Sequence, residues 1–443
     1  MSRSIEAHQG ELRALLARAA PDDATETVPL ARAAGRVLAR DLVAPLDLPP
    51  HTNAQMDGFA VRVSDLAAVP PDGGIDLPVT AIRAAGAAPA VHTAGAATAV
   101  MTGAVIPEGA DAVVPVERVS PPRFDTPLVT VPGSVARDVA EGAFVRAAGS
   151  DVARGAVALP AGTLLGAAAL GACAALGLTD TSPLPVRQPP RVVVVSGGDE
   201  IRPAGETLPP GAVHDANGPL LAAWLRAAGV DSVTRLGVDD DPDAFLARLG
   251  DVVARVRPHL VITSGGISAG AFEVVRLALG RAGREMWFGH VAVQPGGPQG
   301  CGTLLGVPVV CLPGNPVSTW VSCELFVRPA LAAVWGCCEP PRWFTARLQE
   351  PVQPLPDRTQ LRRGVLDHSD CPPRVSLAGG ASSHLLTAAA RADALVRIAP
   401  GAQQLPAGTP LAVLPVAGGP RAGAPVTAGG PAPTNDDESG EPR

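Results

Sequence analysis

The chain has 443 residues, of which 47% are hydrophobic and 17% charged, so it can bury about three domain cores and is not disordered as a whole. Its net charge of −7 argues against nucleic acid or an anionic membrane as the main partner. All 35 basic residues are arginine, because the sequence contains no lysine. Arginine side chains and backbone N–H groups must therefore hold any bound anion.

The N-terminal 20 residues predict an ordinary amphipathic helix and lack the features of a signal peptide. The apolar runs, such as the one that begins at Gly166, are too short for a membrane span. The 7 cysteines are scattered and form no C-x-x-C pair, which is typical of reduced thiols in the cytosol. We therefore expect a soluble, cytoplasmic protein.

The first third of the chain has a proline or glycine about every ten residues, which favours short β-strands, for example at 128–131 and 156–159. Two loops in this part, 51–62 and 101–117, hold polar residues among turn formers. By their spacing alone they would be ordinary turns. The proline-rich stretch 182–190 then predicts a domain boundary.

The pattern changes after this boundary to strands that alternate with helices. Residues 191–195 form a β-branched run, as expected for a strand buried on both faces, and further strands are predicted at 260–263 and 307–312. Helices are predicted between and beside them at 218–229, 243–257 and 273–282. The alternation predicts a parallel, doubly wound sheet, whose carboxyl edge forms the binding crevice.

Glycine-rich loops follow the three predicted strands, at 196–199, 264–270 and 313–318. Glycine permits positive φ and close approach by a ligand, and free N–H groups at a following helix attract anions. Three such loops at one sheet edge predict a site for an extended phosphorylated ligand. The sequence has neither a P-loop nor a dinucleotide-binding fingerprint, which disfavours a plain nucleotidase or dinucleotide enzyme.

Carboxylates cluster on the same loops. Glu200 follows the first strand, Asp215 lies on the next loop, and Asp240 and Asp241 precede the second helix. Carboxylates beside phosphate-binding loops commonly hold Mg²⁺. Helix capping is the alternative, and it is the stronger one for Asp240 and Asp241, which stand directly before a proline.

Several longer motifs occur in a fixed order along the chain. They are N-A-Q-M-D-G-F-A-V-R at 53–62, M-T-G at 101–103, P-E-G-A-D at 107–111, S-G-G-D-E at 196–200, D-A-N at 215–217, D-D-P at 240–242, T-S-G-G-I-S at 263–268 and L-P-G-N-P-V-S at 312–318. In these motifs the chain resembles the molybdopterin molybdenumtransferase family of the bacterial MoeA type, which includes the E domain of gephyrin. The resemblance covers nearly the whole chain up to about residue 416.

The resemblance implies a multidomain α/β plus β protein. Its centre would be a doubly wound, molybdopterin-binding (MogA-like) α/β domain, accompanied by a β-rich insert domain and a small C-terminal β-barrel. The implied parts are an elongated dimerisation domain at 1–48 and 138–185, the insert at 49–137, the α/β domain at 190–338 and the barrel at 339–416. The tail at 417–443 is low in large apolar residues, and we expect it to be disordered.

The resemblance also implies an activity. The family inserts molybdate into adenylylated molybdopterin, giving molybdenum cofactor and AMP, and uses Mg²⁺. Its members form homodimers whose active site combines the α/β domain of one subunit with the β-rich part of the other. A molybdopterin adenylyltransferase would be the pathway partner, with no role for nucleic acid or membrane. Mg²⁺ and fixed N–H dipoles would stabilise the negative charge that builds up when molybdate attacks the phosphoanhydride, and no protein nucleophile is assigned.

Carried over by position, the family's functional residues fall into three groups. The catalytic group is Asp57, Thr102, Glu200, Asp240 and Asp241, with Asp57, Thr102 and Asp151 on the partner subunit's side. Metal ligands would be Glu200, Asp241 and Asp151. The residues that bind the pterin phosphate or AMP would be Ser196, Gly198, Asp215, Ser264, Gly265, Gly266, Ser268, Pro295, Pro313, Gly314, Asn315 and Ser318.

This chain departs from the family pattern at four places. The K-P-G-K-P loop reads Q-P-G-G-P at 294–298, so both lysine positions are lost and arginine does not replace them. The family's S-V-G-x-x-D motif ends here in Glu273 instead of Asp. Its R-x-x-G-E-D motif has Ser150 in place of Glu, and its S-T-G-D-E motif has Gly197 in place of Thr. These changes weaken anion or metal binding if the family roles hold. They leave open a degenerate paralogue that binds molybdopterin or a partner without efficient metal insertion, and a scaffold like gephyrin in its receptor-anchoring role.

Overall fold

The computed structural model describes residues 2–20, 24–67, 69–70, 72–238, 241–267 and 274–416. The chain divides into two compact units, one made of Met1–Ala24 with Gln188–Arg443 and the other of Thr25–Arg187. Asp240, Ser268 and Glu273 lie outside the described residues, and so does the tail 417–443 that we expect to be disordered. The predictions for these residues therefore stay predictions.

The first unit is built on a six-stranded sheet with the order β15-β12-β16-β20-β19-β17. The parallel strands are β12 (Val192–Gly197), β15 (Val233–Val238), β16 (Leu260–Ser264) and β20 (Val307–Leu312), whereas β19 (Pro298–Leu304) and β17 (Arg284–His290) are antiparallel. The doubly wound sheet and its three predicted strands are confirmed. The edge strand β15 escaped prediction because it is only partly buried, so its sequence is not a continuous apolar run.

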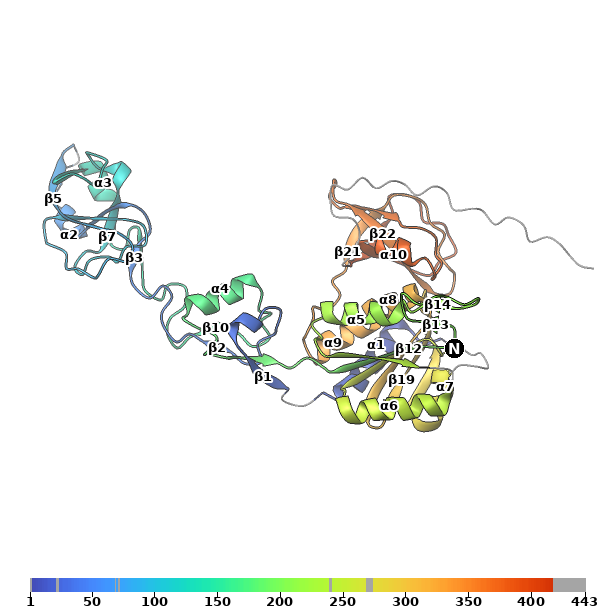
Figure 1. Cartoon of the computed structure of the whole chain (residues 1–443). Helices are drawn as coiled ribbons and strands as arrows, with labels where there is room; N and C mark the ends of the chain where they lie inside the picture. Colours follow the sequence, from blue (N-terminus) through green and yellow to red (C-terminus); the bar gives the residue numbers. More distant parts are fainter. Residues whose placement is uncertain are drawn as a thin grey trace, which may run out of the picture. The chain divides into compact units, whose positions relative to one another are not determined.

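Side chains alternate between the two faces of this sheet. Val192 and Val194 lie in one core, and Val193 and Val195 lie in the other. The first core is covered by α1 (Ile5–Ala17), α5 (Asn217–Ala227), α8 (Pro316–Ser322) and α9 (Arg328–Val334). The second is covered by α6 (Pro242–Val256) and α7 (Val274–Ala282), so that helices flank the sheet on both sides (Figure 1).

One helical stretch in the described residues, Pro316–Val334, is long and apolar enough to cross a membrane by length and composition alone. It consists of α8, a π-helical turn η3 (Cys323–Val327) and α9. In the fold 67% of its most apolar window is buried, and Val317, Val321 and Leu331 belong to the core beneath the sheet. Its apolar character is therefore explained by packing against the sheet.

A small closed barrel follows the α/β domain. Strand β22 (Thr359–Asp367) pairs with β23 (Arg374–Leu377) and β24 (Ala394–Ile398), while β21 (Phe344–Leu348) pairs with β23 and β25 (Pro410–Pro415), and β24 with β25 closes the ring. Leu361, Leu395 and Leu414 of these strands belong to the same core as α8 and α9. The barrel is thus packed directly on the α/β domain, which confirms the expected C-terminal β-barrel.

The second unit contains a five-stranded sheet with the order β7-β4-β6-β5-β8. Its strands are β4 (Gly58–Val61), β5 (Gly74–Arg83), β6 (Ala97–Val100), β7 (Ala112–Pro115) and β8 (Leu128–Pro132), packed with α2 (Val63–Leu66) and α3 (Gly133–Asp138). The rest of the unit has short pairs, β1 (Thr25–Val28) with β11 (Leu184–Arg187) and β2 (Leu42–Val43) with β10 (Val157–Leu159), around α4 (Ala167–Ala175). A β-rich part is therefore present, as predicted.

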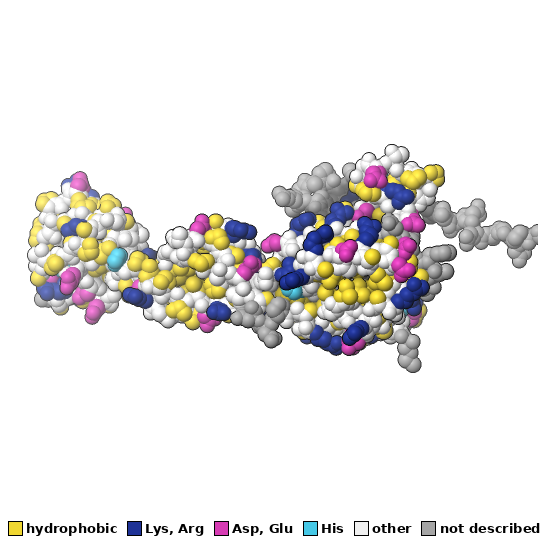
Figure 2. Space-filling model, turned by 60° about the horizontal axis from the view of Figure 1, so that its bottom comes forward, with side chains coloured by type: hydrophobic (Ala, Val, Ile, Leu, Met, Phe, Trp, Pro, Cys, Tyr) yellow, Lys and Arg dark blue, Asp and Glu magenta, His cyan; other side chains and the backbone are white. Residues whose placement is uncertain are grey.

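The surface carries both signs of charge. Every dark-blue side chain in Figure 2 is arginine, because the chain has no lysine, and acidic and basic side chains are interspersed over the face shown.

Candidate functional site

A cavity of about 1180 Å³ lies at the carboxyl ends of the parallel strands, where the doubly wound fold predicts the binding crevice. Its wall combines the loops after β12, β16 and β20 with the 294–298 loop and with residues of the barrel. Among the residues expected at the site, the cavity brings together Ser196, Gly198, Glu200, Asp215, Ser264, Gly265, Gly266, Pro295, Pro313, Gly314, Asn315 and Ser318.

The loop after β12 needs glycine for two separate reasons. A Cβ atom at Gly197 would lie 2.1 Å from the carbonyl oxygen of Val238 on the neighbouring strand. Gly198 has a φ of +142°, and a Cβ there would lie 2.6 Å from Oε2 of Glu200. The backbone therefore passes close under the Glu200 carboxylate, which has no hydrogen-bond or ion-pair partner among the described residues and lines the cavity.

Asp215 is held in place by three donors. Its Oδ2 accepts hydrogen bonds from the Ser196 hydroxyl at 3.1 Å and from Arg235 at 2.8 Å, and its Oδ1 accepts one from the N–H of Gly218 at 2.9 Å. The carboxylate thus ties the end of β12 to the start of α5 and to the edge strand. Its contribution to the cavity is mainly to fix these elements.

Asn217 was not singled out as a site residue from the sequence, although it belongs to the D-A-N motif. Its side-chain N–H donates to the carbonyl oxygen of Gly314 at 2.6 Å, which connects the start of α5 to the loop after β20. Its Oδ1 is buried, lines the cavity region and accepts no hydrogen bond from the described residues. A buried acceptor without a partner favours a bound donor group at this point.

The loops after β16 and β20 lie in contact. The hydroxyls of Ser264 and Thr319 both donate to the carbonyl oxygen of Pro313, at 3.1 and 2.7 Å. Gly265 has a φ of +94°, and a Cβ at Gly314 would lie 3.3 Å from its Cα. The two backbones can approach this closely only because both residues are glycine.

The loop that lacks the family's lysines is held by amide groups. Gln299 donates to the carbonyl oxygen of Gly296 at 2.7 Å and to the Ser322 hydroxyl at 2.8 Å. Gln360, from the barrel, donates to Oε1 of Gln294 at 3.4 Å, and its own Oε1 is buried without a donor among the described residues. Hydrogen bonds of uncharged side chains therefore fix this loop, in which the family pattern has charged lysines.

The barrel adds residues to the cavity that the sequence did not reveal, Arg358, Ser382 and Ser383. The exposed Arg358 also pairs with Asp357 at 2.6 Å. The buried Arg363 shapes the adjoining loop by donating to the carbonyl oxygens of Ala378, Gly380 and Ser382. Arg358 brings a permanent positive charge to a cavity from which both lysines are missing.

Three carboxylates were expected to hold Mg²⁺. Glu200 lines the cavity, but Asp241 is the N-cap of α6 and accepts hydrogen bonds from the N–H groups of Asp243 and Ala244 at 2.8 and 3.0 Å. These bonds lower the pKa of Asp241 and give it the capping role that the sequence had offered as the alternative. Asp151 lies in the other unit. Within the described ranges, no three His, Cys, Asp or Glu side chains gather at metal-binding distances.

In the second unit, Asp57 and Thr102 form a pair on the surface. Oδ1 of Asp57 accepts hydrogen bonds from the Thr102 N–H at 2.7 Å and from its hydroxyl at 2.8 Å. These two bonds lower the pKa of Asp57, so that the carboxylate stays ionised at neutral pH. Both residues are exposed, so the fold brings two residues of the expected catalytic group together on the surface of this unit.

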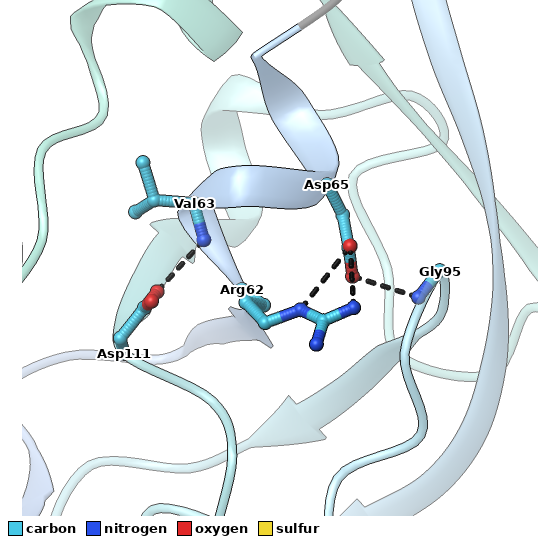
Figure 3. Close-up of polar contacts among 5 residues, drawn as sticks. All are labelled: Arg62, Val63, Asp65, Gly95 and Asp111. Carbon is cyan, nitrogen blue, oxygen red and sulfur yellow. Dashed lines mark hydrogen bonds and ion pairs between the residues drawn. The ribbon is translucent and has the colours of Figure 1, made fainter.

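Polar residues in and near these motifs have a structural role (Figure 3). Arg62 forms an ion pair with Asp65 at 2.8 Å, and Asp65 also accepts a hydrogen bond from the N–H of Gly95 at 2.7 Å. Asp111 accepts one from the N–H of Val63 at 2.7 Å and so caps the short helix α2. Only part of each motif is thus available for a ligand.

Three sequence families match consecutive parts of the chain. The MoeA N-terminal region (domain I and II) matches residues 3–177, a probable molybdopterin binding domain matches residues 193–333, and the MoeA C-terminal region (domain IV) matches residues 345–416. The cavity is lined by residues from the second and third of these regions.

Curated relatives and a solved structure agree with these matches. Molybdopterin molybdenumtransferase 2 of Mycobacterium tuberculosis is 39% identical over 424 residues, which cover 93% of this chain and 99% of the relative. The molybdopterin molybdenumtransferase of Synechococcus elongatus is 35% identical over 72% of this chain and 78% of its own length. The crystal structure of the molybdopterin biosynthesis moeA protein from Pyrococcus horikoshii has a TM-score of 0.76 at 25% identity, covering 94% of this chain and 100% of that one.

Proposed function

This chain belongs to the MoeA family, and on that premise we propose that it is a molybdopterin molybdenumtransferase. It takes adenylylated molybdopterin and molybdate as substrates and releases molybdenum cofactor and AMP. The observation that carries the proposal is the cavity at the strand ends, which combines close-packed glycine loops, an unpaired carboxylate and an arginine. An extended, phosphorylated substrate needs this combination of backbone access and charge.

Arg358 supplies the fixed positive charge toward the anionic substrates. A guanidinium makes charge-assisted hydrogen bonds to phosphate or molybdate oxygens, and it keeps its charge at any physiological pH. The hydroxyl of Ser382 and the backbone around Ser383 lie in the same wall and add neutral groups. The site therefore binds anions through one arginine and neutral donors, whereas the family pattern has two lysines in the 294–298 loop.

Mg²⁺ fits this site through Glu200. The cation is commonly bound by one or two protein carboxylates together with substrate phosphate oxygens, and Glu200 offers an unpaired carboxylate at the cavity wall. When bound there, Mg²⁺ would neutralise charge on the phosphoanhydride. Glu200 would orient the metal, and Asp241 would act at the same end of the sheet, on the neighbouring strand-to-helix connection.

We propose that the active site is completed by a second copy of the chain. The support is that Asp57 and Thr102 form a pre-organised pair, yet both side chains are exposed. Asp57, Thr102 and Asp151 would then contribute to the cavity of the partner subunit in a homodimer. The proposal also includes domain boundaries at residues 48, 138, 190 and 339, a cytoplasmic location, and a molybdopterin adenylyltransferase that supplies the substrate.

Complementation tests the function. The chain is expressed in bacteria that lack their own insertase, with Asp57→Ala and Glu200→Ala as controls, and a molybdoenzyme is assayed at ordinary and raised molybdate. We expect activity that both substitutions abolish. Activity only at raised molybdate would show that the missing lysines weaken binding of the molybdate anion. No activity from a soluble, folded protein would contradict the enzyme and favour a paralogue that binds molybdopterin without inserting metal.

A further inference from the structure

Two adjacent cysteines, Cys337 and Cys338, lie outside the cavity and have no role in the proposed reaction. They follow the end of α9, in the segment that leads to the first strand of the barrel. Both are half-buried, whereas the isolated Cys371 is exposed. The remaining cysteines are buried: Cys173, Cys301, Cys311 and Cys323. The pair is therefore distinguished by having two neighbouring cysteines that are only partly buried.

The backbone around the pair is held firmly. Gly336 adopts a left-handed φ of +59°, which turns the chain at the end of α9. The carbonyl oxygen of Cys337 packs against Gly229, where a Cβ atom would approach it to 2.4 Å. The thiol of Cys338 donates to the carbonyl oxygen of Arg328 at 3.8 Å. These contacts fix the backbone of the pair and the Cys338 sulfur beside the end of α9.

A buried charge network lies beside the pair. Arg328 donates to Glu324 at 2.6 and 3.1 Å, and Glu324 also accepts a hydrogen bond from the Trp224 indole at 2.8 Å. Glu324 belongs to the π-helical turn, an insertion in the helix that places this carboxylate in the core. The network therefore places a guanidinium near the Cys338 sulfur.

The two thiols are not equivalent. A hydrogen bond from Cys337 and the positive charge of Arg328 lower the pKa of Cys338, although burial acts in the opposite direction. The same hydrogen bond, together with burial, raises the pKa of Cys337. Cys338 is thus the member of the pair that reaches the thiolate form, and Cys337 is the thiol that hydrogen-bonds to it.

We propose that Cys337 and Cys338 form a thiol–disulfide exchange site, which a low-molecular-weight disulfide oxidises to a vicinal disulfide. The Cys338 thiolate attacks one sulfur of the small disulfide, forms a mixed disulfide and expels one thiolate. The Cys337 sulfur then attacks the Cys338 sulfur and expels the second, after giving up its proton. Two protein thiols are oxidised, and one disulfide molecule is reduced to two thiols.

The product is expected to form reversibly. Adjacent Cα atoms are about 3.8 Å apart across a trans peptide, which is below the range of about 4.4–6.8 Å that unstrained disulfides adopt. A strained disulfide is reduced more readily than a structural one. The site would therefore respond to the thiol–disulfide ratio of its surroundings and would not be a permanent cross-link.

The test uses the full-length native protein, and it does not depend on the proposed function. The reduced protein is incubated with glutathione disulfide, free thiols are then alkylated, and the peptide that contains both cysteines is analysed by mass spectrometry. We expect this peptide to lose two hydrogen atoms and to take up no glutathione, and dithiothreitol to reverse the change. Cys371 should instead carry glutathione, because no second thiol is adjacent to it.

Two variants define the order of the steps. Cys337→Ser should accumulate a stable glutathione adduct on Cys338, since the resolving thiol is missing, whereas Cys338→Ser should react much more slowly at Cys337. Cys371→Ser is the control and should leave oxidation of the pair unchanged. Unmodified cysteines, or glutathione retained on either of them in the folded wild-type protein, would overturn the proposal. That decision rests on the wild type and does not require a variant to fold.

Discussion

The cavity of the α/β unit and the Asp57–Thr102 pair of the second unit represent two different ways of preparing a functional site. The cavity is concave, and most of its polar groups are hydrogen-bonded to other parts of the same unit, as Asp215 and Ser264 are. The Asp57 carboxylate is exposed and, among the described residues, accepts hydrogen bonds from Thr102 alone. One region therefore has a concave binding wall, while the other presents an oriented carboxylate on an exposed surface, which is the feature that the proposed second subunit would use.

The largest expected effect is a loss of activity in an Asp57 variant that folds as stably as the wild type. Asp57→Asn keeps the size of the side chain but removes its charge, and we expect insertion activity to fall by about 10²–10³-fold, as is typical when one positioned electrostatic group is removed. Because Asp57 is exposed, the free energy of unfolding should stay within about 0.5 kcal/mol of the wild type. Steady-state kinetics and urea denaturation measure the two quantities.

Asp65→Asn is the matched control in the same unit. It weakens the bonds to Arg62 and Gly95, so we expect a loss of stability of about 1–2 kcal/mol and little change in the activity of the folded fraction. The reverse pattern, with Asp57 needed for stability and Asp65 for turnover, would contradict the division of each motif into a functional and a structural part.

Acid should destabilise the α/β unit through a buried histidine. His8 in α1 is fully buried, and burial together with nearby Arg3 lowers its pKa to about 4. The folded state therefore favours neutral His8, so its contribution is complete above the unfolded pKa of about 6.5 and is lost as the pH falls toward 4. The loss should amount to about 3 kcal/mol for the α/β unit.

Asp65 in the second unit acts in a lower pH range. Its ionised form stabilises the fold above the unfolded pKa of about 3.9, and this contribution is lost as the pH falls through the lower folded value. Burial also lowers the pKa of His92 in the second unit, so the dependence near neutral pH is assigned with a variant. His8→Asn should flatten the dependence between pH 6.5 and 4, and an unchanged slope in that variant would show that another group is responsible.

The next effect concerns the charge of the cavity. Arg358→Gln removes the permanent cation, and we expect the apparent affinity for molybdate to fall by about 10–100-fold, corresponding to one charge-assisted hydrogen-bonded contact. Arg342→Gln is the control, because that arginine is also exposed and ion-paired, with Glu339 at 2.5 Å, but does not line the cavity. Equal effects of the two substitutions would remove Arg358 from the site.

The smallest expected effect is a gain. Gln294→Lys places an ammonium group where Gln294 now meets Gln360, whose buried Oε1 has no donor among the described residues and could accept from it. We expect affinity for molybdate to rise by up to about tenfold. Gln294→Met is a matched neutral control of similar length. Unchanged affinity in the lysine variant would mean that the loop's uncharged residues do not limit anion binding.

The sequence was most informative where geometry leaves few choices. The β-branched strands and the glycine loops after them could be located because burial on both faces and close backbone contact each allow few residue types, as at Gly197 and Gly265. The resemblance to the MoeA family added Asp57 and Thr102 as expected catalytic residues, and the fold shows that these residues, 45 apart in the sequence, are hydrogen-bonded. Spacing alone would have left them as ordinary turn residues.

Other site residues could not be predicted because their role arises from tertiary packing. Arg358, Ser382 and Ser383 reach the cavity only because the barrel packs on the α/β core, a contact that local patterns do not encode. Asn217 had the same composition signal as any polar turn residue, and its unpaired oxygen becomes visible only in the fold. Asp241 shows the converse, since its capping bonds account for its position without any ligand.

The measurement that tests the central claim most directly is release of AMP by the purified protein. The chain is mixed with adenylylated molybdopterin, molybdate and Mg²⁺, and AMP is quantified with and without molybdate. We predict AMP release that requires molybdate and is lost in Asp57→Asn and Glu200→Gln. A folded protein that binds the adenylylated pterin but releases no AMP at any molybdate concentration would contradict the assignment as a molybdenumtransferase.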